Sequence, residues 1–311
     1  MSKEKEERKQ NCPEFKSGFV AMLGRTNVGK STLVNLLVGE KVAATANKVQ
    51  TTRTAIRGIV NRENSQIIFI DTPGIHKPKT KLNETMIETS FGVLNDIDLI
   101  LFVIEATSED IGRGDMKILE KIKQANKKTI LIINKIDLIK REKLLHLIDL
   151  YQKEYNFEAG IPISSLKEKY RDIILDEIES HLKPGPAYYD IEEYTDQTLR
   201  QLAEETIREM ALRHLKDEVP HGIFVEVEKM KNRKNQKGED LYDIEATIYC
   251  LRNSHKGIII GKDGSMLKQI GQSARIDMER NFGTKVNLKT WVKVKEDWQD
   301  DNSIVKRFKL Q

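Results

Sequence analysis

Hydrophobic and polar residues alternate with two different periods between Phe19 and Leu182. Four short runs rich in Ile, Val and Phe have the length of buried strands: Phe19–Leu23, Ile67–Ile70, Leu99–Ile104 and Ile130–Ile133. Between them, apolar residues recur at helical spacing in Lys30–Val38, Gly114–Ala125, Glu142–Tyr155 and Lys167–Leu182. Strands without a polar face that alternate with helices predict a mostly parallel sheet with helices on both faces.

A different order of elements follows Lys183–Ala187, where two prolines and a glycine break the pattern. Thr198–Leu215 has the spacing of a long helix, with Thr195 and Asp196 as candidate caps. Two alternating strands joined by a polar loop, a short helix, the tetrapeptide Gly261–Gly264, a helix and a last strand come next, which predicts a smaller α+β domain. The predicted boundaries are a charged tail over residues 1–15, an α/β domain over 16–183, a linker over 184–195 and a second domain over 196–311.

Composition limits the class of protein. Of 311 residues, 39% are hydrophobic and 32% charged, and no window approaches the roughly 18 apolar residues of a membrane-spanning helix. The charged start, Met1–Lys9, lacks the apolar core of a signal peptide. With Cys12 and Cys250 as the two cysteines, neither a disulfide framework nor a Cys-rich zinc site is expected, which indicates a reducing compartment. The net charge of +4 permits nucleic-acid binding without deciding it.

A candidate phosphate loop follows the first predicted strand and opens a helix. Residues 24–31 read GRTNVGKS and fit the pattern GxxxxGK[ST]. Glycines let the backbone fold around a phosphate, so that N–H groups and the helix N-terminus face the negative charge. Lys30 would reach the β- and γ-phosphates, and the Ser31 hydroxyl would ligate Mg²⁺. The predicted contact residues are Gly24, Arg25, Thr26, Asn27, Val28, Gly29, Lys30, Ser31 and Thr32.

The next candidate group of ligands directly follows the strand Ile67–Ile70. It consists of Asp71, Thr72, Pro73 and Gly74. A carboxylate at a strand end opposite the phosphate loop suits the Mg²⁺ shell, through a water molecule, and the Gly74 N–H suits a γ-phosphate.

Two later segments predict a guanine site. The sequence NKID at residues 134–137 follows a buried strand, and Asp137 can accept hydrogen bonds from N1–H and the 2-amino group of guanine. Adenine would leave that carboxylate unpaired, which is unfavourable. Backbone N–H groups of the SSL turn at residues 164–166 would meet guanine O6. The predicted base-binding residues are Asn134, Lys135, Asp137, Ser164, Ser165 and Leu166.

In this order the four motifs resemble the translation-factor-like GTPases, and three further segments narrow the resemblance. Gln50–Arg53 (QTTR), Asp71–Lys79 (DTPGIHKPK) and Trp291–Lys295 (WVKVK) are similar to the Era family of ribosome-assembly GTPases. The resemblance runs from about Ser17 to Trp298. It implies a cytoplasmic, GTP-hydrolysing switch that binds small-subunit (16S-type) ribosomal RNA near its 3′ end and assists assembly of the small (30S) subunit. It also allows peripheral contact with the inner face of the membrane, and implies no small-molecule substrate beyond GTP and water.

The resemblance also assigns catalytic roles. The first switch loop becomes Glu40–Ile56, with Thr52 as the threonine that senses Mg²⁺ and Thr51 as its alternative; a solvated loop is the other interpretation. Ile75 stands where Ras-like enzymes place a water-orienting glutamine, so hydrolysis would depend on Mg²⁺, Lys30 and backbone dipoles, and intrinsic turnover would be slow. The predicted catalytic residues are Lys30, Thr52 and Gly74, and the predicted Mg²⁺ residues are Ser31, Thr52 and Asp71.

Asn27 matches the asparagine with which similar families hold a potassium ion. Such an ion would take the electrostatic role of an arginine finger. An ordinary turn residue is the alternative interpretation of Asn27.

The second domain matches the element order of a type II KH domain, with the GxxG tetrapeptide Gly261-Lys262-Asp263-Gly264 before a helix. KH modules clamp about four single-stranded nucleotides, with the GxxG loop against the backbone. Ile258, Ile259 and Ile260, with Ile270 from the next helix, would form a floor for bases or belong to the core, and the carboxylate of Asp263 would lower affinity. The basic run Lys229–Lys237 is either a solvated loop or a phosphate-contacting arm. The predicted RNA-binding residues are Ile258, Ile260, Gly261, Lys262, Asp263, Gly264, Lys268, Lys229, Lys231 and Arg233.

Other functions fit parts of the same pattern. A P-loop phosphotransferase with an accessory RNA-binding domain would need an acceptor pocket and has no use for the NKID segment. A GTP-regulated protein that acts on a different RNA would carry the same motifs. A protein that binds only RNA and keeps a vestigial nucleotide site would lack Lys30, Ser31 or Asp71, and all three are present.

Overall fold

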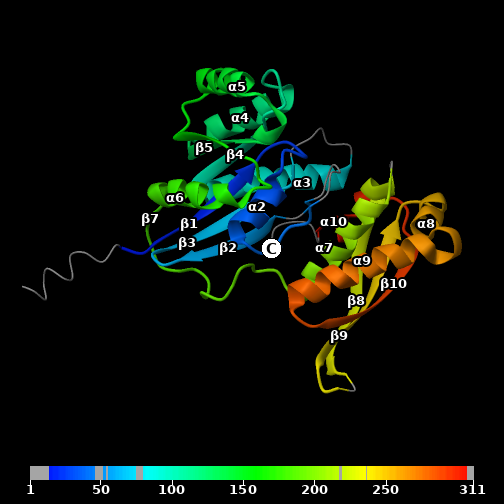
Figure 1. Cartoon of the computed structure of the whole chain (residues 1–311). Helices are drawn as coiled ribbons and strands as arrows, with labels where there is room; N and C mark the ends of the chain where they lie inside the picture. Colours follow the sequence, from blue (N-terminus) through cyan, green and yellow to red (C-terminus); the bar gives the residue numbers. More distant parts are fainter. Residues whose placement is uncertain are drawn as a thin grey trace, which may run out of the picture.

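The computed structural model describes residues 14–45, 52–53, 55–74, 80–216, 219–235 and 237–306. The strands form two sheets, and helices pack on each sheet to enclose a separate core. The two sheets lie side by side (Figure 1). Most of the predicted tail, together with Cys12, Thr51 and Ile75, lies outside the described residues. Within the described part of the chain, no helix combines the length and apolar character needed to cross a bilayer.

The first sheet has seven strands and is mostly parallel. Its strands are β1 (Lys16–Leu23), β2 (Ile56–Arg62), β3 (Ser65–Asp71), β4 (Leu99–Glu105), β5 (Lys128–Asn134), β6 (Ala159–Pro162) and β7 (Lys183–Pro184). The order is β2-β3-β1-β4-β5-β6, with β7 paired to β1. β2 and β7 run antiparallel to their neighbours, and the other neighbours pair in parallel.

Helices cover both faces of this sheet, as predicted. They are α2 (Lys30–Val38), α3 (Lys81–Gly92), α4 (Arg113–Ala125), α5 (Arg141–Glu154) and α6 (Arg171–His181). Successive strand residues point to opposite faces, so each central strand contributes to two cores. Leu33 of α2 and Ile178 of α6 pack in one core. Phe91, Ile118 and Leu147, from α3, α4 and α5, pack in the other.

The sequence pattern did not identify β2 or α3. β2 is a sheet-edge strand whose run IRGIVNR includes polar residues and a glycine, so it lacks a continuous apolar signal. α3 buries Asn83, Thr85, Thr89 and Ser90 as well as apolar residues, which weakens its amphipathic pattern.

The second sheet has three strands, in the order β10-β9-β8. Its elements are α7 (Leu199–His214), β8 (Ile223–Lys234), β9 (Asp240–Cys250), α8 (Asn253–Ile260), α9 (Ser265–Phe282) and β10 (Lys285–Val294). β8 and β9 are antiparallel, whereas β9 and β10 are parallel. The predicted α+β order is therefore confirmed, and its core contains Ile207 of α7, Ile244 of β9 and Met278 of α9.

Two local predictions in this part were wrong. Thr198, and not Thr195 or Asp196, caps α7. Its side chain accepts from Gln201 N, and Gln201 Oε1 accepts from Thr198 N. The polar loop predicted between the two strands is shorter than expected, because most of the basic run lies within the strand β8, which extends to Lys234.

The segment between the two sheets is hydrogen-bonded along the edge of the first one. Gln66 Oε1 accepts from Tyr188 N and Tyr189 N at 2.7 and 3.0 Å, and Ile59 N donates to Tyr194 O at 2.9 Å. This segment, green in Figure 1, passes below β2 before α7 begins. It covers the open edge of β2, which would otherwise expose unpaired backbone groups.

Short helical segments complete the fold. They are 3₁₀ turns at Val93–Asn95, Ile136–Leu138, Glu168–Tyr170, Val219–Gly222, Lys262–Gly264 and Trp298–Asp300, and the helix α10 (Asn302–Val305). The last two return from the second sheet to α3, where Trp298, Ile304 and Val305 pack with Leu82 and Met86. The two halves of the chain therefore share a small apolar cluster.

Candidate functional site

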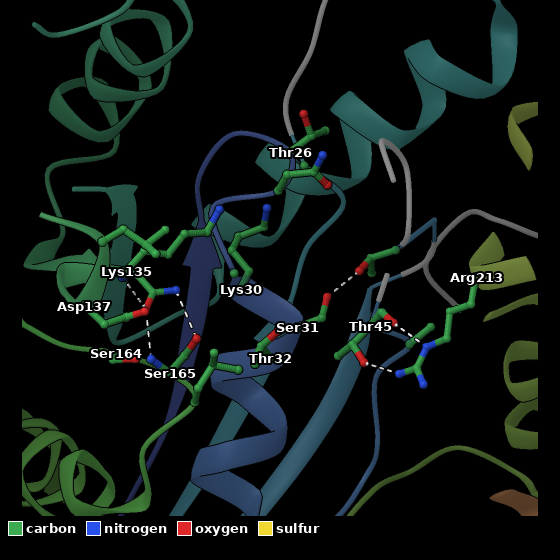
Figure 2. Close-up of a pocket in the computed structure, with 18 residues that line it drawn as sticks. Thr26, Lys30, Ser31, Thr32, Thr45, Lys135, Asp137, Ser164, Ser165 and Arg213 are labelled. Atoms are coloured by element: carbon green, nitrogen blue, oxygen red, sulfur yellow. Dashed lines mark hydrogen bonds between the residues drawn. The ribbon is translucent and has the colours of Figure 1, made fainter. Parts of the chain in front are cut away.

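The predicted nucleotide motifs surround one cavity of about 620 Å³ at the carboxyl ends of the parallel strands. Figure 2 shows the phosphate loop between the predicted base-binding residues and the start of the first switch segment. The cavity is lined by Thr26, Asn27, Gly29, Lys30, Ser31, Thr32, Ala44, Thr45, Thr52, Gly74, Asn134, Lys135, Asp137, Leu138, Ser164, Ser165, Leu166 and Arg213.

Lys30 lies across the phosphate loop, held by that loop's own carbonyl groups. Its Nζ donates to Gly24 O at 3.1 Å and to Arg25 O at 2.9 Å. Burial lowers the pKa of Lys30 to about 8, although nearby Asp71 opposes the shift. Asn27 and Gly29 adopt positive φ angles of 64° and 100°, which turn the loop back on itself. An ammonium that is buried and bonds to carbonyls alone among the described residues is suited to an anionic ligand.

The three residues predicted to bind Mg²⁺ are in mutual contact. Ser31 Oγ lies 2.7 Å from Asp71 Oδ2 and 2.8 Å from Thr52 Oγ1, and Thr52 Oγ1 lies 3.1 Å from Asp71 Oδ2. Asp71 is fully buried, and its Oδ1 has no hydrogen-bond partner among the described residues. Burial raises the pKa of Asp71, while Lys30 and the two hydroxyls oppose that shift. Hard oxygen donors around a buried, incompletely bonded carboxylate fit Mg²⁺.

Gly74 is pressed against the phosphate loop. A Cβ placed on it would lie 2.7 Å from Thr26 Cα, so a side chain here would displace the loop backbone. Only glycine fits between the end of β3 and the loop, which supports the predicted place of Gly74 beside a terminal phosphate.

Asn134 ties the phosphate loop to both base-binding segments. Its Nδ2 donates to Val28 O at 2.8 Å and to Ser165 Oγ at 3.1 Å. Its Oδ1 accepts from Lys135 N at 2.8 Å and from Ser165 N at 2.9 Å. These four hydrogen bonds fix the phosphate loop and the SSL turn relative to each other, and Asn134 also lines the cavity.

Asp137 is exposed in the cavity and free to contact a base edge. A hydrogen bond from Ser164 is the main cause that lowers the pKa of its carboxyl. The carboxylate is therefore ionised at neutral pH and can accept two N–H groups. Lys135 lies beside it with its Nζ 3.1 Å from Glu105 Oε1.

Several predicted nucleotide residues stand behind the cavity wall. Arg25 turns away to α4, with its Nε 2.9 Å from Asp115 Oδ2. Thr72 is buried and donates to Met22 O at 2.6 Å, and Val28 is 1% exposed. The predicted residues absent from the cavity lining are Gly24, Arg25, Val28, Asp71, Thr72 and Pro73. These residues lie outside the cavity lining and pack behind the loops that form it.

Four lining residues were not predicted: Ala44, Thr45, Leu138 and Arg213. Leu138 directly follows the NKID segment, so its position was available from the sequence. Arg213 comes from α7 and donates from Nε to Thr45 O at 3.2 Å, as Figure 2 shows. No local pattern links residues so far apart in the chain.

The GxxG tetrapeptide lies at the turn between α8 and α9. Gly261 and Gly264 have positive φ angles of 72° and 77°, and Asp263 also has a positive φ of 53°. Beside it is a groove of about 460 Å³, lined by Gly264, Leu267, Lys268, Gly271, Gln272, Arg275, Leu288 and Thr290. Among these, Gly264 and Lys268 were predicted and Arg275 was not.

The predicted isoleucine floor divides between surface and core. Ile258 is 50% exposed and Ile260 is partly buried, whereas Ile259 and Ile270 are fully buried. Ile258 therefore remains available beside the GxxG turn, Ile260 packs partly against the core, and the other two are core residues.

Carboxylates of β9 pair with much of the basic run on β8. Lys229 Nζ lies 3.4 Å from Glu245 Oε1, and Arg233 forms an ion pair with Asp243. Lys231 has no ion-pair partner within the described ranges. These cross-strand pairs reduce the charge that β8 presents to a polyanion.

Comparison with known proteins agrees with both halves of the chain. Residues 19–135 match the model "50S ribosome-binding GTPase", and residues 218–299 match "KH domain". GTPase Era of Thermoanaerobacter sp. (strain X514) is 48% identical over 293 residues, 94% of this chain and 96% of that protein. GTPase Era of Ruminiclostridium cellulolyticum is 49% identical over 292 residues, with 94% and 96% covered. The chain belongs to the Era family of GTPases.

Solved structures of Era share the whole architecture. One is Era in complex with MgGDPNP and nucleotides 1506–1542 of 16S ribosomal RNA, at 39% identity and a TM-score of 0.89, covering 94% of this chain and 98% of that one. Another is a single-residue variant of Aquifex aeolicus Era bound to GDP and AlF₄⁻, also at 39% identity and a TM-score of 0.89, covering 94% of this chain and 99% of that one. The Era fold therefore extends over both sheets of this chain.

Proposed function

We propose that this chain is a Mg²⁺-dependent GTPase whose KH domain binds the 3′ end of small-subunit ribosomal RNA and assists assembly of the 30S subunit. The observation that carries the proposal is a single cavity that joins a buried lysine, a cluster of Mg²⁺-type oxygens and the exposed carboxylate of Asp137. The Era structure with MgGDPNP and 16S ribosomal RNA supports both the nucleotide and the RNA.

The residues of the site divide the work of hydrolysis. Lys30 would neutralise the β- and γ-phosphates, and the backbone of Gly74 would contact the γ-phosphate. Ser31, Thr52 and, through water, Asp71 would hold Mg²⁺, which neutralises phosphate charge as it develops. Asp137 selects guanine. Ile75 has no polar atom that could orient the attacking water, so we expect intrinsic turnover to be slow.

We further propose the domain boundaries 16–183, 184–195 and 196–311. The bonds from Gln66 and Ile59 to residues 188–194 make the linker part of the surface of the first domain. The proposed location is the cytoplasm, with peripheral contact at the inner face of the membrane, and GTP and water are the proposed substrates.

RNA binding at the GxxG turn is tested by a matched pair of variants. Gly264 has space around it, since a Cβ there would meet nothing within 4 Å, whereas a Cβ on Gly261 would lie 2.7 Å from Met266 Cβ. Gly264→Asp and Gly264→Ala share the strain of a positive φ, but only the first adds charge. We expect Gly264→Asp to weaken binding to an oligonucleotide that copies the rRNA 3′ end about tenfold beyond Gly264→Ala.

The measurement is fluorescence anisotropy at one fixed salt concentration, with a scrambled oligonucleotide as a second ligand. Equal weakening by the two variants would remove the GxxG turn from the interface. Equal affinity of the unmodified protein for both oligonucleotides would favour the alternative function, a GTP-regulated protein that acts on a different RNA.

Potassium use is a separate part of the proposal. Asn27 lines the cavity, is exposed, and has the positive φ of a turn residue, so its side chain is free to ligate an ion. We expect hydrolysis to be about tenfold faster in KCl than in NaCl, because a cation beside the phosphates stabilises developing charge. Asn27→Gly keeps the turn but removes the side chain, and should make the two salts equivalent. Equal rates in both salts for the unmodified protein would leave Asn27 as a turn residue.

A further inference from the structure

Arg53 immediately follows Thr52 in the chain, yet its side chain is buried against the KH domain. It is 2% exposed, and its Nη1 donates to the Ile223 carbonyl at the start of β8. Its guanidinium carbon lies 5.3 Å from the centre of the Trp298 ring. The residue next to the proposed Mg²⁺ threonine is therefore anchored in the other domain.

The Trp298 ring that contacts the Arg53 guanidinium is itself held in place by the KH domain and α3. The indole is fully buried, and its Nε1 donates to Gly222 O at 3.1 Å. Its ring lies 4.7 Å from the Phe224 ring, and it packs in the apolar cluster with Leu82 and Met86 of α3. Because Trp298 is packed on several sides, its ring keeps its position, and Arg53 can leave the ring only if the contact between the two domains changes.

The other end of the first switch segment is also attached to the KH domain. Lys41 forms ion pairs with Glu209 of α7, at 2.8 Å, and with Asp277 of α9. Thr45 donates from Oγ1 to Glu209 Oε1 at 3.1 Å and accepts from Arg213. The KH domain thus contacts the segment on both sides of Thr52.

Burial of Arg53 is opposed by its surroundings. Desolvation and then the neighbouring Arg208 lower the pKa of Arg53 to about 9, while Glu205 opposes the shift. The guanidinium remains charged at neutral pH and retains its interaction with the Trp298 ring. The contacts with the Ile223 carbonyl and the Trp298 ring stabilise the buried charge of Arg53 beside Arg208, and they exist only while the two domains are in contact.

We propose that Arg53 is a positioning residue for GTP hydrolysis: its anchorage in the KH domain holds the Thr52 hydroxyl against Ser31 and Asp71. The inference rests on the proposed Mg²⁺ role of Thr52 and adds that the KH domain sets the position of that threonine. Movement of the KH domain then changes the Mg²⁺ site through Arg53, the KH-anchored residue next to Thr52.

The test compares Arg53→Met, Arg53→Lys and Arg57→Met in the full-length protein. We expect Arg53→Met to lower kcat about tenfold and to raise the half-saturating Mg²⁺ concentration about tenfold, with KM for GTP within about twofold. Arg53→Lys should lie within about threefold of the unmodified protein, because an ammonium can still bond to the Ile223 carbonyl and face the Trp298 ring. Arg57→Met removes an ion pair to Asp196 that lies away from the site, and should change kcat less than about twofold.

Binding of nucleotide without turnover gives a second readout. In Arg53→Met, the ratio of the Kd for Mg²⁺·GDPNP to the Kd for GDP should rise about tenfold, because contacts with the γ-phosphate and its Mg²⁺ are what order a GTPase switch segment. A kcat within about twofold of the unmodified protein, or an equal loss of affinity for both nucleotides, would overturn the inference. Thr52→Val separates the two proposals: if it leaves hydrolysis and Mg²⁺ dependence unchanged, the role of Thr52 fails. If it impairs them while Arg53→Met does not, only the role of Arg53 fails.

Discussion

Gly29→Ala is expected to lower the affinity for GDP and GTP at least about a hundredfold, because it combines backbone strain with a steric clash at the centre of the site. Gly29 has a φ of 100°, and a Cβ on it would lie 2.2 Å from Asn134 Nδ2. That nitrogen bonds to Val28 O and Ser165 Oγ, so the added methyl group would separate the phosphate loop from the base-binding segments. Titration with a fluorescent GDP derivative measures the loss.

Gly39→Ala is the matched control. Gly39 ends α2 with a φ of 85°, but a Cβ there would meet nothing within 4 Å. The change should reduce the free energy of unfolding by about 1 kcal/mol through backbone strain and leave GDP affinity within about twofold. If both variants lost affinity equally, strain alone would explain the effect and the contact with Asn134 would be irrelevant.

Asp137→Asn is expected to weaken GDP binding about a hundredfold or more, because an amide cannot accept from two guanine donors as a carboxylate does. The amide NH₂ instead suits xanthine, which carries a carbonyl in place of the 2-amino group. The preference for GDP over XDP should therefore fall by a larger factor than the affinity for GDP itself. Competition between the two nucleotides against one fluorescent ligand measures that preference.

An exposed aspartate elsewhere supplies the comparison for this variant. Asp149 lies on α5 and pairs with Lys153 at 2.6 Å on the surface. Asp149→Asn removes the same charge from the same domain and should leave both affinities within about twofold. An unchanged ratio of GDP to XDP affinity in Asp137→Asn would show that Asp137 does not contact the base edge.

The sequence was informative wherever chemistry depends on neighbours in the chain. The phosphate loop, the segment Asp71–Gly74 and the NKID segment each lie at the end of a strand in one mostly parallel sheet, and the carboxyl ends of its parallel strands meet at one edge. Their convergence on one cavity therefore followed from local spacing and strand order. The order of elements after Ala187 predicted the KH domain in the same way.

Contacts between distant segments were not predictable from that spacing. Arg53 looks like a solvated loop residue until Ile223 and Trp298 are placed around it. The basic residues of β8 looked free because pairing with β9 depends on strand register, and a bulge between Val227 and Lys229 shifts that register. A single sequence carries no local signal for either arrangement.

The linker bonded along β2 has a mechanical consequence. Thr195 bridges to Gly58 and donates to Arg57 O at 2.7 Å, and Gln197 Nε2 donates to Val42 O at 2.8 Å, just before α7 begins. Because the linker is hydrogen-bonded to the first domain up to Gln197, it does not act as a flexible hinge that would let the KH domain rotate by small angles. Reorientation requires several bonds to release together, and the angle between the domains should change in discrete steps.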